Sequence, residues 1–447
     1  CTSYGNGWGY YYGLDVPRWV NCIGAENTAL DWNVADTPGA TVTHNLASDT
    51  TAPGTVHWDS KTLTFANAAG NDYRLAADDW DARGRGANLS RDPVFAFNDD
   101  ITGRLRTQWD LGAAEYCISS RRRGVNEVVK TFGASGQGRD YTDPAAWESD
   151  TDNDLAEAAQ SEVLECYADQ TFTSATVGYV SGATTTAYFN RTIRAASGSR
   201  HFGIPGAGVK FDLGTGQYFA YITEPYCSVQ DIEVGVAGNY DGWLAGVVST
   251  TNSLVVGVIA KIANAGTGSG QGLLKNDSSV LYAPFVNCLA YECADDGFSM
   301  RGSTDLMLAC TSANNGRNGM YWAAEDPVVR GTLCWGNATR DFDSSMAEAD
   351  NGYNFSKDNS APGSGSLTNQ TADPFNASGS SDYRLKAGSA ALDVGVSMLD
   401  YAPFPFEDDI AWVRRPAGAW DVGAAEYVAT EQPPSGATKF FFRRWRW

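Results

Sequence analysis

The chain has 447 residues and a formal net charge of −21, with 48 glycines, 12% aromatic residues and 19% charged residues. So acidic a surface repels a phosphate backbone, which argues against nucleic-acid binding. There is no run of roughly 18–20 apolar residues that could span a membrane. The length suffices for a large buried core. Abundant Gly, Asn and Asp favour short strands joined by tight turns, so we expect an all-β fold.

Residues 1–120 repeat the last third of the sequence that follows them, at a spacing of about 310 residues. Cys22 is aligned with Cys334 in this comparison. A chain that opens inside a repeat unit presents an incomplete coil, so we expect a longer natural polypeptide, a cleaved one, or another subunit stacked on this end. The matching segments are 1–7 with 310–316, 72–75 with 382–385, 99–101 with 408–410, and 109–116 with 420–427.

A junction at residues 119–124, which contains Arg121, Arg122 and Arg123, leads from this partial unit into a complete second unit, residues 125–428. The best helix candidate of the whole chain lies near the start of that unit, at residues 154–165. No long run elsewhere has apolar residues at positions i, i+3, i+4 and i+7. The second unit is therefore expected to consist mainly of strands.

Within the second unit, Cys288, Cys310 and Cys334 lie 22 and 24 residues apart, each at the end of a short apolar strand. We interpret them as one position that recurs once per coil and forms an internal stack, because a thiol packs well as a small apolar group. Disulfides or metal ligation are the alternatives. One such coil cannot bury its inward face alone, so successive coils must share a continuous core.

The coil length and the Asp-Asp-Gly-Phe turn at 295–298 resemble the pectate-lyase-like superfamily of parallel β-helix proteins. The entry segment at 140–148 and the closing segments at 382–395 and 420–427 resemble those of phage-encoded and secreted β-helix proteins. The resemblance implies a right-handed parallel β-helix, a solenoid with a partial first unit (1–120) and a complete second unit (125–428). It also implies an extracellular, cell-surface or virion location. It leaves the activity open, because the superfamily contains both enzymes and non-catalytic proteins.

Asp295 and Asp296 form the sharpest polar cluster, with Arg301 five residues further on. By the resemblance to lyases, such carboxylates would bind Ca²⁺, which favours several oxygen ligands, and Arg301 would act as a base or substrate clamp. In hydrolases of this fold, the pair would serve as acid and base. The other interpretation is structural, since Asp296 falls where Asn318 falls on the next coil and turns favour both residue types. We favour the structural interpretation and assign no catalytic residue, no metal site and no cofactor, with Ca²⁺ left as an alternative.

The three histidines, at positions 44, 57 and 201, show no metal-binding spacing and no arrangement with a nucleophile. His201 lies in a Gly-Ser-Arg-His-Phe-Gly segment and is expected to be a turn residue. The repeated Trp-Asp-hydrophobic-Gly-Ala-Ala-Glu-Tyr segment is expected to be a strand that lies along the β-helix and closes the end of each unit.

Residues 429–447 form a Pro/Gly linker and a basic, aromatic tail on an otherwise acidic protein. So apolar a terminus favours burial, and Arg and aromatic residues are preferred anchors at protein interfaces. We expect docking onto an acidic subunit, which includes another copy of the chain. Packing on its own β-helix and insertion into a membrane are the alternatives, the latter the weakest. The expected docking residues are Phe440, Phe441, Phe442, Arg443, Arg444, Trp445, Arg446 and Trp447.

Two functions follow from these features. The favoured one is a non-catalytic structural β-helix protein of a virion (a decoration, spike or fibre) or of an extracellular surface filament. It would assemble with itself or with capsid or appendage proteins. The alternative is a polysaccharide lyase or hydrolase, or a glycan-binding protein of the tailspike type. The thin inventory of catalytic residues and the tandem units favour the first.

Overall fold

The structure is a computed structural model. It describes residues 1–11, 18–33, 41–68, 72–75, 79, 81–82, 85–87, 89, 110–113, 120–121, 124, 126–186, 189–214, 218–238, 244–249, 252–264, 270–276, 284–301, 305–323, 327–343, 350–399, 401, 404–416 and 418–428. The tail residues 440–447 named above lie outside this part.

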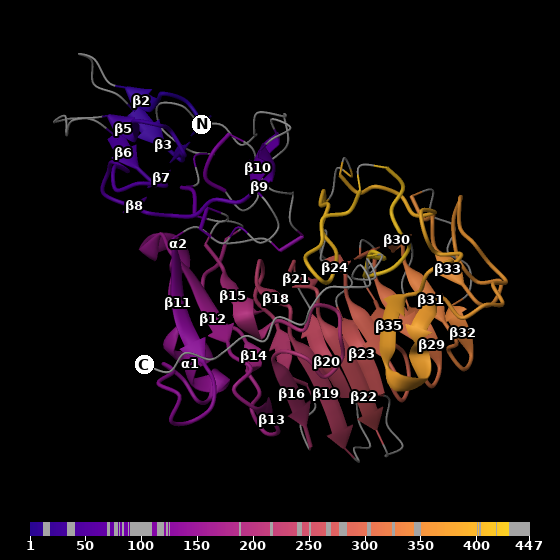
Figure 1. The fold of residues 1–447 in the computed structure, drawn as a ribbon. Coiled ribbons are helices and arrows are strands. Elements are labelled where there is room, and N and C mark those ends of the chain that lie inside the picture. The colour runs from indigo at the N-terminus through magenta and orange to yellow at the C-terminus, as the bar shows by residue number, and fades with distance from the viewer. Residues whose placement is uncertain are drawn as a thin grey trace.

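The second unit winds through three parallel sheets, and each complete coil contributes one strand to each of them (Figure 1). Sheet 1 contains β11 (Glu127–Phe132), β12 (Ser161–Cys166), β15 (Arg191–Ala195), β18 (Ser228–Gln230), β21 (Leu254–Val256), β24 (Pro284–Val286), β27 (Leu306–Leu308) and β30 (Val328–Arg330). Sheet 2 contains β13 (Thr171–Phe172), β16 (Lys210–Leu213), β19 (Glu233–Gly238), β22 (Ile259–Asn264), β25 (Leu289–Tyr291), β28 (Thr311–Ala313), β31 (Leu333–Trp335) and β33 (Phe355–Ser356). Sheet 3 contains β14 (Gly178–Val180), β17 (Ala220–Ile222), β20 (Leu244–Ser249), β23 (Gly270–Lys275), β26 (Phe298–Met300), β29 (Asn318–Trp322) and β32 (Arg340–Phe342). The predicted parallel β-helix is confirmed; its right-handedness stays a prediction.

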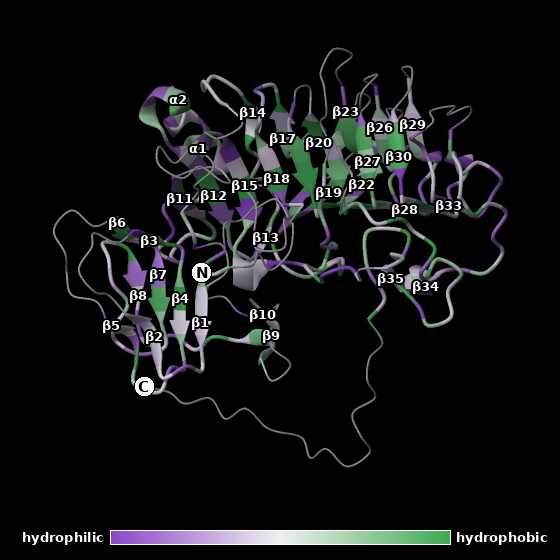
Figure 2. Cartoon of the chain, turned by 90° about the horizontal axis from the view of Figure 1, so that it is seen from above, coloured by the Kyte–Doolittle hydropathy of each residue, from purple (hydrophilic) through white to green (hydrophobic). Residues whose placement is uncertain are grey.

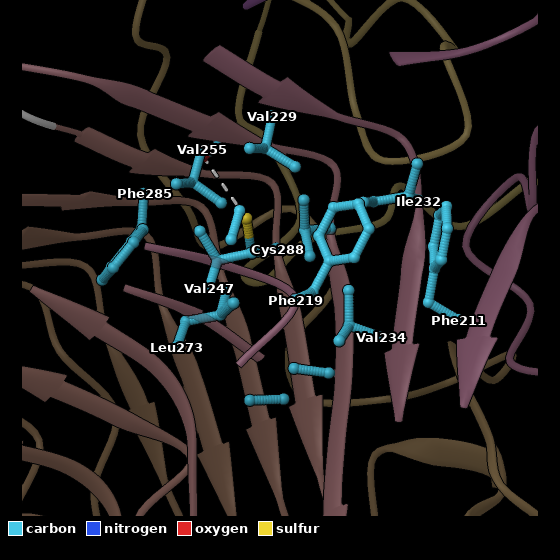
Figure 3. Close-up of a cluster of buried hydrophobic side chains, with 14 of the residues drawn as sticks. Phe211, Phe219, Val229, Ile232, Val234, Val247, Val255, Leu273, Phe285 and Cys288 are labelled. Atoms are coloured by element: carbon cyan, nitrogen blue, oxygen red, sulfur yellow. Dashed lines mark hydrogen bonds between the residues drawn. The ribbon is translucent and has the colours of Figure 1, made fainter. Parts of the chain in front are cut away.

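Like positions of successive coils fill the interior. Val229 pairs in register with Val255, and Val255 with Phe285, so this column of sheet 1 is apolar from coil to coil. Val247 and Leu273 form a matching column in sheet 3. Figure 3 shows these side chains converging on one core from different sheets. Because no single coil could bury these groups, the stack stabilises itself cooperatively.

Two short helices lie at the entry end of the second unit, α1 (Pro144–Asp150) and α2 (Leu155–Ala158) (Figure 1). Trp147 on α1 is fully buried and joins the main core cluster. The predicted helix over 154–165 is wrong beyond residue 158. Ala159 adopts a left-handed conformation with φ 51°, which ends α2, and the apolar run that follows enters β12. No helix among the described residues is long and apolar enough to cross a membrane.

The predicted cysteine stack is confirmed for two of its three members. The backbone N–H of Cys288 donates to Sγ of Cys310 at 3.5 Å, and the N–H of Cys310 donates to Oγ1 of Thr332 at 3.4 Å. Thr332, and not Cys334, therefore continues the column, because these coils are 22 residues long. Cys334 lies two residues further on and pairs in register with Ser312. All three cysteines are buried free thiols.

The segment at 420–427 lies along the β-helix, as expected, but it covers the flank and not the end, so the predicted end cap is wrong. Residues 422–425 form bends and no strand. Gly423, with φ 111°, donates its N–H to the carbonyl of Gly331, and the N–H of Ala424 donates to Oγ1 of Thr311 at 2.9 Å. The antiparallel hairpin of β34 (Phe375–Ala377) and β35 (Asp382–Leu385) packs on the same outer face, that of sheet 2. The segment buries apolar residues that alternate with the inward ones along β25, β28 and β31.

The described part of the first unit repeats this closing architecture. A four-stranded parallel sheet is flanked by two two-stranded parallel sheets and an antiparallel hairpin. Its register aligns Thr2 with Ile23, as Thr311 is aligned with Leu333 in the second unit, so Cys22 corresponds to Thr332 and the predicted match of Cys22 to Cys334 is wrong. The strands are β1 (Thr2–Tyr4), β2 (Trp8–Tyr11), β3 (Arg18–Val20), β4 (Ile23–Ala25), β5 (Leu30–Asn33), β6 (Thr41–Thr43), β7 (Asn45–Ala47), β8 (His57–Trp58), β9 (Phe65–Asn67) and β10 (Asp72–Leu75).

The junction between the units is anchored in the second one. Arg121 is 1% exposed, and its guanidinium lies 2.7 Å from Oδ1 of Asp231 on the β-helix and 2.9 Å from Oδ2 of Asp408, which lies between the closing segments at 382–395 and 420–427. The N–H of Ser120 donates to the other oxygen of Asp408. Burial opposes a charged guanidinium, but the two carboxylates raise the pKa of Arg121 further above its usual range. This single buried cation therefore links the junction, the coils and the part of the chain between the closing segments.

Candidate functional site

The acidic pair predicted from the sequence lies on the turn between β25 and β26. Asp296 is fully buried, and its Oδ1 accepts hydrogen bonds from Nε of Arg317 at 2.9 Å and from the backbone N–H and Nδ2 of Asn318 at 3.2 and 3.0 Å. Its Oδ2 forms an ion pair with Nη2 of Arg317. Both oxygens of the Asp296 carboxylate are therefore engaged with the next coil.

Asp295 is more accessible and shares the same cation. Nε of Arg317 lies 2.8 Å from its Oδ1, and the Asp295 side chain is 16% exposed. Burial raises the pKa of Asp295, the adjacent Asp296 charge adds to the rise, and Arg317 opposes it. The hydrogen bond to Asp296 raises the pKa of Arg317, whose guanidinium also lies 4.9 Å from the ring centre of Tyr321.

The cation that contacts both carboxylates is Arg317, which sequence reasoning missed, whereas Arg301 follows the opposite end of β26. A signal was available, because Arg317 lies one 22-residue coil after Asp295 and parallel stacking places like positions on top of one another. The arrangement is that of an ion pair between coils. Both oxygens of Asp296 already have donors from the protein. Neither is therefore placed to accept a substrate proton or to activate a water molecule.

The residues around this turn do not fit the Ca²⁺ site that the resemblance implied. Ca²⁺ takes six to eight oxygen ligands, and here Asp296 already accepts from Arg317 and Asn318, and Asp295 pairs with Arg317. Among the residues that the structure describes, no group of three or more His, Cys, Asp and Glu side chains could hold a metal ion.

His201 is a structural residue of the kind that its glycine-rich segment predicted. It is fully buried, its Nδ1 accepts from the N–H of Gly203 at 3.0 Å, and its Nε2 lies 2.7 Å from the carbonyl oxygen of Gly257. Burial lowers its pKa to about 4, so the imidazole is neutral at pH 7 and donates through Nε2.

An exposed aromatic cluster on the outer face of sheet 3 was not predicted. Tyr179 on β14 is 57% exposed, and its ring centre lies 5.7 Å from that of Tyr218 and 5.0 Å from that of Tyr221 on β17. Figure 2 shows that the next strand, β20, is largely apolar, and the buried Ala245, Val248 and Leu274 pack against Tyr218 and Tyr221. The cluster presents flat rings with hydroxyl edges, a surface suited to stacking with a ring-shaped ligand.

Comparison with known proteins gives one informative result. No protein-family model matches the sequence, and no curated protein matches it. Among solved structures, the chain is similar to the crystal structure of pectate lyase Pel9A, at 15% sequence identity and a TM-score of 0.38, over 69% of this chain and 98% of that one. The similarity concerns the fold alone, and the assignment of the fold here rests on the three parallel sheets themselves.

Proposed function

We propose that this protein is a non-catalytic structural β-helix, a building block of a virion (decoration, spike or fibre) or of an extracellular surface filament. The observation that supports this most directly is the state of Asp296. The best catalytic candidate in the sequence is buried and bound by Arg317 and Asn318 of the next coil, so it contributes to the stack and not to a reaction.

The repeated closing architecture also supports this proposal. A single chain with two copies of one module, each with the same register between its strands, suits an elongated structural protein. We further propose that the protein acts outside the cell or on a virion and assembles with its own copies or with capsid or appendage proteins. The basic, aromatic tail would dock onto an acidic subunit.

The decisive experiment separates catalysis from stability. We expect Asp296→Ala to lower the free energy of unfolding by about 3 kcal/mol, since it leaves the N–H and Nδ2 groups of buried Asn318 without their acceptor. Arg317 would keep its contact with Asp295. We expect Asp295→Ala to lower it by less than about 1 kcal/mol. Unfolding in guanidinium chloride measures both. The parent protein should release no oligosaccharide from acidic polysaccharides. Cleavage by the parent that Asp295→Ala abolishes at unchanged stability would overturn the proposal in favour of a lyase or hydrolase.

The tyrosine cluster supports a second candidate, glycan binding without cleavage. Rings of Tyr179, Tyr218 and Tyr221 lie within 5.7 Å of one another on an exposed sheet face. Affinity electrophoresis in gels that contain polysaccharide tests this. Retardation that Tyr179→Ala removes supports a glycan-binding role, and equal migration of the parent in every gel argues against one.

A further inference from the structure

A pocket of about 240 Å³ opens between the turn that follows β15 and the closing segment. It concentrates exposed apolar side chains. The large hydrophobic residues that are exposed among the described residues number eight, and three of them line this pocket, namely Phe202 at 43%, Ile204 at 39% and Val428 at 59% exposure. Leu385, Val413 and Tyr427 complete its apolar wall. Clustered exposure of this kind marks an interaction site more often than scattered single residues do.

The turn that carries Phe202 and Ile204 is held rigidly in place. Phe202 adopts a left-handed conformation with φ 48°, which is unfavourable for a bulky residue and persists only where the surroundings enforce it. Neutral His201 beneath it accepts from the N–H of Gly203 and contacts Gly257, and Glu233 accepts from the N–H of Gly206 at 2.5 Å. The turn thus carries two exposed apolar side chains on a backbone that several hydrogen bonds hold to the β-helix.

Four polar side chains line the pocket, and each already has a partner. Arg384 pairs with Asp382 at 2.8 Å, and Asn376 also hydrogen-bonds to Asp382. The carboxylate of Asp409 accepts from the backbone N–H groups of Ala411, Val413 and Glu426 at 2.8, 2.8 and 2.9 Å. The carboxylate of Glu426 forms an ion pair with the fully buried Arg415 at 2.5 Å. A polar ligand would find few unsatisfied groups here, whereas an aromatic ring would bury apolar surface.

We propose that this pocket receives an aromatic side chain of the basic tail, residues 439–447, from a neighbouring copy of the chain. The proposal rests on the proposed function of a self-assembling subunit. Val428 lies on the rim, and nineteen residues follow it in the sequence, with five aromatic residues and four cations among the last nine. The remainder of the chain is strongly acidic, so charge favours the approach of such an arm. The pocket has room for one aromatic ring, and exchange of identical terminal arms between copies is a common route to assembly.

Two full-length variants test the two sides of this contact separately. The chain that supplies the tail is called the donor, and the chain that supplies the pocket is called the acceptor. The acceptor variant, Phe202→Asn with Ile204→Asn, removes the apolar wall, and Asn tolerates the left-handed backbone at position 202. The donor variant replaces Phe440, Phe441, Phe442, Trp445 and Trp447 by Ser. Tyr226→Asn is the matched control, because Tyr226 is also exposed, at 39%, and left-handed, with φ 61°, but does not line the pocket. Sedimentation velocity measures the association of each protein, and circular dichroism confirms that each is folded.

We expect the parent and the Tyr226→Asn control to associate within twofold of one another, and each of the other variants to associate at least tenfold more weakly. An equimolar mixture of the two variants should form a one-to-one complex, because it contains one intact tail and one intact pocket. Association of the parent without complex formation in the mixture would overturn the pocket and leave self-assembly standing. If the parent were monomeric and the mixture still formed a complex, the pocket would be confirmed as the receptor of the tail. In the parent, however, the tail would then bind the pocket of its own chain, and this result would overturn self-assembly. No association in any sample would overturn both.

Discussion

The first coils of the chain and the last coils of the second unit carry the same ladder of side-chain hydrogen bonds. Asn27 and Asn337 each donate Nδ2 to an aspartate four residues on, at 2.8 Å in both. Oγ1 of Thr2 accepts from the N–H of Ala113 at 3.1 Å, and Oγ1 of Thr311 accepts from the N–H of Ala424 at 2.9 Å. These contacts recur although the two regions rest on different neighbours.

The regions differ in the stack to which they belong. In the second unit, β28 and β29 pair on one side with β25 and β26 and on the other with β31 and β32. In the described part of the first unit, β1 pairs with β4 and β2 with β5. The ladder is therefore encoded by the local sequence of the closing coils, whereas the long core and the anchored junction belong to the second unit.

The largest expected effect concerns the junction, which sharpens this contrast. Replacing Arg121 by Met leaves Asp231 and Asp408 buried without their cation, so we expect a loss of about 3–5 kcal/mol from the unfolding free energy of the second unit. Denaturant unfolding followed by hydrogen exchange assigns the loss to a unit. As a control, Lys130→Ala removes an exposed pair with Asp140 at 4.0 Å and should change stability by less than about 1 kcal/mol. Equal effects of the two substitutions would contradict the role given to Arg121.

A smaller effect tests whether the two ladders are equivalent. Asn354 accepts from the N–H of Thr332 and donates to the carbonyls of Val329 and Pro362. Asn45 makes the corresponding bonds in the first unit, to Cys22, Trp19 and Pro53.

Replacing either asparagine by Ala leaves several buried backbone groups unsatisfied, at an expected loss of about 3 kcal/mol each. Exchange rates of the Thr332 and Cys22 amide protons measure the local effect. A loss confined to one unit would show that the length of the stack, and not the local sequence, sets the strength of the ladder.

The sequence predicted the fold because coil length and core position recur together over residues 288–334. The prediction was wrong for Cys334, which was aligned with the other cysteines from the spacing between cysteines alone. Cys334 lies two residues past the column of Cys288 and Cys310, and a 24-residue spacing between cysteines does not reveal that the coil itself has 22 residues. The predicted helix over 154–165 is wrong because left-handed Ala159 and the following Gln160 separate four helical residues from the strand β12.

The sequence revealed a candidate site only where the residues that form it lie close together along the chain. Asp295 and Asp296 were identified because they are adjacent in sequence, and Arg317 would have followed from the coil length. The tyrosine cluster could not be predicted in this way, since Tyr179 and Tyr221 are register partners 42 residues apart, unlike the later coils. The pocket joins the turn at Phe202 to residues 376–428, and no short-range pattern connects segments so distant.

The smallest expected effect is a difference in pH dependence between equivalent aspartates. Burial raises the pKa of Asp341 to about 6, and the charge of Asp358 adds to this against the hydrogen bond from Asn337. Burial would also raise the pKa of Asp31, but hydrogen bonds from Ser48 and Asn27 outweigh it and hold the value below the ordinary 3.8. The Ser48 hydroxyl donates to Asp31 at 2.6 Å, whereas at the corresponding position Lys357 offers Asp341 only its backbone N–H.

These shifts act on stability in opposite directions. An acid with a raised pKa keeps its proton longer in the folded state, so the coil around Asp341 should lose about 2 kcal/mol as the pH rises from 4 to 7. An acid with a lowered pKa stabilises the folded state at pH values above the pKa that the group has in the unfolded chain. The coil around Asp31 should therefore lose stability as the pH falls below 4. Amide exchange at Lys357 and Ser48, whose N–H groups donate to these carboxylates, measures both. Lys357→Ser supplies the missing hydroxyl and should flatten the dependence around Asp341, whereas Lys357→Ala should not. If serine and alanine had the same effect, a cause other than the missing hydroxyl donor would have to distinguish the two coils.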